Sequence, residues 1–190
     1  MPHTPANIDA QIKASKFIAA CIINDLATER GPHAETCVTA AARMGGTFLF
    51  RTFGLLTSNI PVGAPILSDI ANERGPVLVE VMKSGLVGLG MEIDERTMQT
   101  GPTEHHAPLI SLIETQQKLD EKLSDIVAAH GLFGDAAARS CALAAAHLIY
   151  QTREVLDPNI SFGLAVYGFV EGTKTNPIPS TRATVPPTQA

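Results

Sequence analysis

The sequence places two histidines directly after a glutamate, in Glu104-His105-His106. Imidazole nitrogens and a carboxylate oxygen are donors that divalent transition metals such as zinc prefer. Two further carboxylates, Asp94 and Glu95, precede this group closely along the chain. We predict either a metal or catalytic site here or a solvated loop, because the side chains of adjacent residues usually diverge.

A segment that suits the end of a helix occurs at residues 24–32 and 68–76, and in fainter form at 124–131. The first two copies share the pattern Asp-x-Ala-x-Glu-Arg-Gly-Pro. Arginine in a last turn and glycine after it both suit a helix C-terminus. Each copy would end one helix and lead into the next, so the pattern indicates either duplicated helical hairpins or a shared helix-stop signal.

Two pairs of carboxylates lie within this repeated segment. Asp25 with Glu29, and Asp69 with Glu73, stand at i and i+4 and would each share one face of a helix. If the pairs converge, their oxygens could bind Mg²⁺ or Mn²⁺, as in a metal-dependent hydrolase. The alternative is that these carboxylates pair with neighbouring arginines or with solvent.

Arg43 and Arg51 lie on an otherwise apolar stretch, with Thr47 between them at i, i+4 and i+8. At helical spacing the three residues form one polar stripe. Two guanidinium groups on such a stripe could bind an anionic ligand bidentately. The alternative is that both arginines are buried and paired with carboxylates of the same chain, which would look identical in sequence.

Several recognisable catalytic patterns are absent from the sequence. There is no Glu-x-x-His motif of the kind that a di-iron helix bundle needs, and no Ser, Cys or Thr nucleophile signature. The glycines of residues 85–90 close an apolar helical segment, whereas a dinucleotide-binding fingerprint follows a strand and opens a helix.

The spacing of apolar residues predicts an all-α bundle of six or seven helices in a single domain, residues 1–172. Gly, Pro and capping residues set the expected helix ranges at 7–29, 33–56, 65–73, 76–89, 108–130, 135–156 and 159–171. The second of these is apolar around most of its circumference, so we predict that it is central. Gly168 and Gly172 would allow a close helix contact within or between subunits. The Pro-rich tail, 173–190, is expected to be disordered or draped over the surface.

Composition and charge restrict the protein class. Apolar residues make up 45% and charged residues 17% of the 190 residues, as in a globular protein. The net charge of −5 argues against nucleic-acid binding, which needs Lys and Arg at phosphates. The three widely spaced cysteines suit reduced thiols in the cytoplasm. No secretory signal and no bilayer-spanning stretch is visible.

These features favour a small cytoplasmic interaction or ligand-binding protein without catalytic activity, and we predict a homodimer. The reason is an excess of apolar helical surface, especially in residues 48–56 and 160–170. A small-molecule ligand is compatible with this interpretation. The rival is a hydrolase that depends on a divalent metal and uses the carboxylate pairs or the Glu-His-His group.

Overall fold

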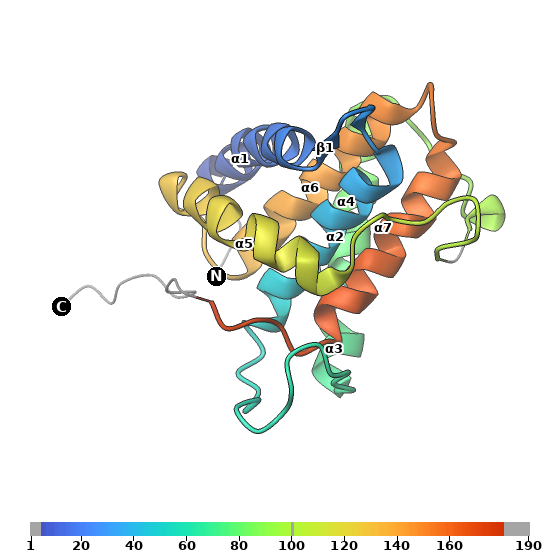
Figure 1. Ribbon diagram of the computed structural model, residues 1–190. Helices are drawn as coiled ribbons and strands as arrows, with labels where there is room; N and C mark the ends of the chain where they lie inside the picture. The colour runs from blue at the N-terminus through green and yellow to red at the C-terminus, as the bar shows by residue number, and fades with distance from the viewer. Residues whose placement is uncertain (1–4, 100, 181–190) are drawn as a thin grey trace.

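The computed structural model describes residues 5–99 and 101–180, which form an all-α bundle (Figure 1). The predicted fold class is confirmed. The elements are α1 (Pro5–Asp25), β1 (Ala27–Thr28), β2 (Gly31–Pro32), α2 (Ala34–Phe50), α3 (Asp69–Arg74), α4 (Pro76–Gly88), the 3₁₀ turn η1 (Glu95–Thr97), α5 (Leu112–Ala129), α6 (Asp135–Thr152) and α7 (Pro158–Thr173). None of these helices combines the length and the hydropathy that crossing a bilayer requires.

Helix α2 runs through the middle of the bundle, as its apolar pattern predicted. Every residue from Thr36 to Phe50 is buried, and α1, α5, α6 and α7 all pack against it. The helix consists largely of alanine, glycine and threonine in its middle turns. These small side chains let the neighbouring helices approach closely, so a nearly apolar helix can be surrounded by four others.

Helix α7 packs along α2 in the same direction, and glycines let the two backbones touch. A Cβ atom added at Gly168 would lie 2.9 Å from the Thr39 carbonyl oxygen. One added at Gly172 would lie 2.3 Å from the Arg43 carbonyl oxygen, and one at Gly46 would lie 2.7 Å from a backbone oxygen of α7. The close contact predicted for Gly168 and Gly172 is therefore made within the chain.

The repeated segment does not adopt one structure in its copies. In the first copy α1 ends at Asp25, and residues 27–32 form the antiparallel hairpin of β1 and β2, with Gly31 at φ +96°. In the second copy Gly75 has φ −56° and joins α3 directly to α4. Both copies end one helix and lead into the next, as expected, but the first does so through a short strand pair and the second through a direct helix junction.

A long loop, residues 51–68, leaves the bundle where α2 ends and leads to α3, at the bottom of Figure 1. The first residues of the expected tail, 174–180, run beside this loop in extended form, with an antiparallel bridge between Pro65 and Thr175. Of the two alternatives for the tail, these residues take the second and drape over the surface. Residues 181–190 lie outside the described part of the chain.

Candidate functional site

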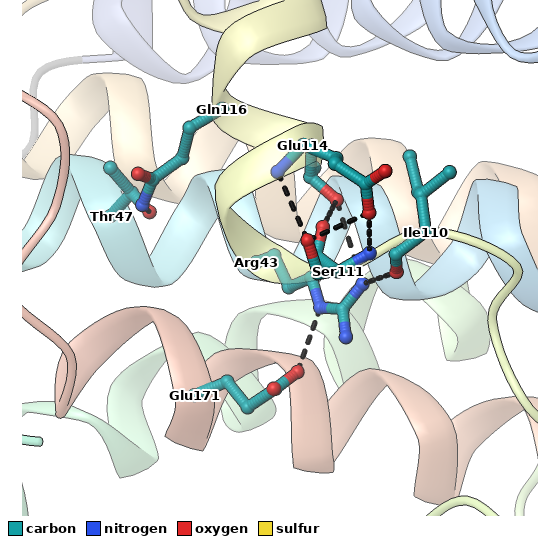
Figure 2. A network of polar contacts seen from close by, with 8 residues as sticks. Arg43, Thr47, Ile110, Ser111, Glu114, Gln116 and Glu171 are labelled. Atoms are coloured by element: carbon teal, nitrogen blue, oxygen red, sulfur yellow. Dashed lines mark hydrogen bonds and ion pairs between the residues drawn. The ribbon is translucent and has the colours of Figure 1, made fainter. Parts of the chain in front are cut away.

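The polar stripe of α2 faces α5, α7 and the C-terminal segment. Arg43 is 4% exposed and Thr47 is fully buried. The Thr47 hydroxyl accepts a hydrogen bond of 2.9 Å from the side-chain amide of Gln116 on α5 (Figure 2). The stripe exists as predicted, and its residues bond to groups on three other parts of the chain.

The guanidinium group of Arg43 lies between the start of α5 and helix α7 (Figure 2). Its Nε donates to Oε2 of Glu171 on α7 at 2.7 Å, and its Nη1 donates to the carbonyl oxygen of Ile110 at 2.6 Å. The same carboxylate lies near Tyr167, whose pKa is raised mainly by burial and further by this negative charge. The charge of Arg43 is therefore balanced within the chain.

Arg51 forms a two-pronged ion pair with Asp120 of α5. Nη1 lies 2.6 Å from Oδ1 and Nη2 lies 2.9 Å from Oδ2, and the two side chains are only 8% and 10% exposed. Nη2 also donates to the carbonyl oxygen of Ile178 at 3.2 Å. Both arginines therefore form ion pairs with carboxylates of the same chain. This is the arrangement expected from the sequence as the alternative to binding an anionic ligand.

The Glu-His-His group lies in the loop before α5, and its members point to different surroundings. Glu104 and His105 are exposed, whereas His106 is half-buried and its Nδ1 lies 3.1 Å from Oε1 of Glu35. Nε2 of His33 lies 3.4 Å from the other oxygen of this carboxylate. Glu35 at the start of α2 thus joins two histidines and ties the loop to the central helix.

The two carboxylate pairs do not form a shared site. Asp25 ends α1 and bonds to Lys122 at 2.7 Å, which holds the pKa of this carboxyl below its ordinary value. Glu29 lies in the hairpin turn, so the prediction that it shares a helical face with Asp25 is wrong. Asp69 and Glu73 both belong to the short helix α3. In the described part of the chain, no group of three or more His, Cys, Asp and Glu residues could hold a metal ion.

The loop between α2 and α3 carries a group of exposed apolar side chains. From Thr52 to Ser68 no residue is ionisable, yet Leu56 is 96% exposed and Leu67 is 84% exposed. Such surface is costly in water and commonly marks a binding region. We call this surface the loop face, defined by Leu55, Leu56, Ile60, Val62 and Leu67.

A groove of about 440 Å³ opens beside the loop face, between the loop and the C-terminal segment. Its volume is in the range of sites that take a small molecule or an anchoring side chain. Among its lining residues only Arg51 is ionisable, and Asp120 neutralises it. Its lining includes Phe50, Arg51, Leu55, Ile60, Val62 and residues 176–180.

Sequence reasoning missed the partners of the polar stripe. They are Thr115, Gln116 and Asp120, which lie among buried leucines on the inner face of α5. Their polar side chains on an apolar face were the available signal, because a buried polar group usually has a hydrogen-bonding partner. The contact between Glu35 and His106 left no comparable signal, since His106 lies in a distant loop, whereas His33 is a neighbour of Glu35 in sequence.

No family model, no curated protein and no solved structure matches the chain.

Proposed function

We propose that this chain is a cytoplasmic interaction protein that self-associates as a homodimer through the loop face. The observation that carries the proposal is the exposure of large apolar side chains on a stretch without any ionisable residue. Removing such side chains from water is favourable at roughly 25 cal/mol per Å². A protein–protein contact is the ordinary way in which a protein covers them.

The loop face carries no charge, and this favours contact with a second copy of the chain. A two-fold interface uses the same patch of both subunits, so any charge near its centre would face a like charge. The loop face avoids this repulsion. The groove beside it, lined in part by Leu55, Ile60 and Val62, offers a hollow for the protruding Leu56 of the partner.

The cysteines support a reducing compartment such as the cytoplasm. Cys21, Cys37 and Cys141 are all free thiols, and burial raises the pKa of Cys37 to about 11. The thiolate that would react is therefore scarce at neutral pH. The rival metal-dependent hydrolase, with the carboxylate pairs or the Glu-His-His group, has less support, because no group of three or more His, Cys, Asp and Glu residues in the described part of the chain could hold a metal ion.

Sedimentation velocity over micromolar concentrations tests the proposal with Leu56→Asp and a matched control, Val155→Asp. Val155 is 79% exposed and lies between α6 and α7. Because α7 runs parallel to α2, that turn is at the opposite end of the bundle from the loop (Figure 1). We expect dimers for the unchanged chain and for Val155→Asp, and monomers for Leu56→Asp, since a buried unpaired carboxylate is strongly unfavourable.

A strict monomer for the unchanged chain would refute self-association. A Leu56→Asp chain that dimerises as well as the control would refute the loop face as the contact. Far-UV circular dichroism of each variant distinguishes a lost interface from a lost fold.

A further inference from the structure

The C-terminal segment, residues 174–180, is bound to the rest of the chain through every second residue. The Lys174 carbonyl oxygen accepts from Ile66 N at 2.7 Å. Asn176 uses both backbone groups: its N–H donates to the Ala64 carbonyl oxygen at 2.9 Å, and its carbonyl oxygen accepts from Gly63 N at 2.8 Å. Alternate bonding of this kind is how an extended peptide adds to the edge of another chain segment.

Ile178 is the next residue in this alternating series, and side chains bind both of its backbone groups. Its N–H donates to Oε1 of Gln116 at 3.0 Å, and its carbonyl oxygen accepts from Nη2 of Arg51 at 3.2 Å. Both side chains are anchored independently of the segment, Gln116 by Thr47 and Arg51 by Asp120. The donors and acceptors are therefore held in position by residues outside the segment.

The intervening positions carry proline at residues 177 and 179. Proline has no backbone N–H, so these positions leave no donor unpaired on the outer side of the segment. Its fixed φ also lowers the conformational entropy that an extended peptide loses on binding. The Asn-Pro-Ile-Pro sequence thus fits the alternation of bonded and unbonded residues.

The side chain of Asn176 also binds the loop, through its amide group. It is 5% exposed, and its Nδ2 donates to the carbonyl oxygens of Ile60 at 2.7 Å and Pro61 at 3.3 Å. An aspartate of the same shape would place a carboxylate against two carbonyl oxygens and could donate nothing. This contact favours asparagine over aspartate at position 176.

We propose that the hydrogen-bonding surface formed by residues 60–66, Arg51 and Gln116 is a peptide-binding site, which takes an extended Asn-Pro-x-Pro segment of a partner protein. Residues 174–180 occupy it within the chain and must be displaced. A tethered segment has a high effective concentration, so a free peptide competes poorly against it. The site shares Ile60 and Val62 with the loop face, but binding of the peptide does not require self-association.

Fluorescence anisotropy with a labelled synthetic peptide of residues 173–180 tests this proposal. Asn176→Asp in the full chain weakens the binding of residues 174–180 to the rest of the chain. Asn72→Asp, at an exposed position of α3, is the matched control. We expect the peptide to bind the Asn176→Asp chain at least about tenfold more tightly than the unchanged chain or the control. A peptide with Asp in place of Asn should not bind.

The proposal is overturned if the folded Asn176→Asp chain does not bind the peptide, or binds the Asp-containing peptide equally well. If Asn176→Asp prevents folding, Asn176→Ala provides the same test, because it removes the side-chain donor without introducing a charge. The oligomeric state of the Leu56→Asp variant tests only the loop face as the contact between copies. It does not decide whether the free peptide binds.

Discussion

Each buried arginine of α2 neutralises a carboxylate from another element, Arg43 with Glu171 and Arg51 with Asp120. Sequence periodicity predicted the polar stripe because helical spacing depends only on neighbouring residues. It could not identify the partners, because Asp120 and Glu171 lie far along the chain and meet α2 only after the helices pack. The same is true of Glu35 and His106.

Breaking the Arg51–Asp120 pair should destabilise the fold strongly. We expect Arg51→Met to lower the free energy of unfolding by about 3–5 kcal/mol, because it leaves an uncompensated carboxylate in a buried position. The double variant Arg51→Met/Asp120→Leu should lose much less free energy of unfolding than the two single variants lose in sum. Urea denaturation measures all three, and a loss below about 1 kcal/mol for Arg51→Met would contradict a buried pair.

His147 on α6 should make stability depend on pH. Burial, and to a smaller extent Lys16, lowers its pKa below the ordinary value of 6.5. The unfolded chain then binds a proton at higher pH than the folded chain, so the stabilisation is complete above pH 6.5 and falls as the pH drops through the folded pKa. We expect His147→Gln to reduce the loss of stability between pH 7 and pH 5. Identical pH profiles in chemical denaturation would show that His147 is not responsible.

At the scale of elements, the helices were largely predictable, since apolar periodicity and Gly or Pro ends are local signals. The two copies of the repeated segment lie between helices, as expected, but they differ in local structure: the same Glu-Arg-Gly-Pro run forms a hairpin end at Pro32 and a helix junction at Pro76. Tertiary packing, not the run itself, selects between them. Residues 174–180 could not be placed from sequence, because their partners are dispersed over α2, α5 and the loop.

The backbone contact between α2 and α7 can be tested at one glycine. Gly172→Ala would put a methyl group 2.3 Å from the Arg43 carbonyl oxygen and 2.8 Å from Thr47 N, so one helix must shift. We expect a loss of about 1–3 kcal/mol or more in the free energy of unfolding.

Gly88→Ala is the matched control for this substitution. It lies at the end of α4, and nothing stands within 4 Å of the added Cβ. Alanine should there stabilise by up to about 1 kcal/mol, because it loses less backbone freedom on folding. Thermal or urea unfolding of the two variants should therefore move in opposite directions, and a stabilising Gly172→Ala would contradict the close packing.

At the scale of the whole molecule, the two ends of the bundle differ in chemistry. The end that carries the loop face and residues 175–180 has no ionisable side chain in either segment. The polar stripe of α2 leads to this end, where Arg51 and Gln116 bind the C-terminal segment. Ion pairs inside the bundle thus support a surface that is itself uncharged, which suits contact with another protein.

The distance between spin labels in the assembled protein tests the central claim most directly. Each subunit carries a single nitroxide in a Cys21→Ser background, either at the exposed loop residue Asn59→Cys or at the exposed Glu154→Cys of the opposite end. Pulsed dipolar spectroscopy then reports only the distance between subunits. A homodimer through the loop face predicts a clearly shorter distance for the Asn59 labels than for the Glu154 labels. The absence of dipolar coupling at both positions, or a shorter distance between the Glu154 labels than between the Asn59 labels, would contradict it.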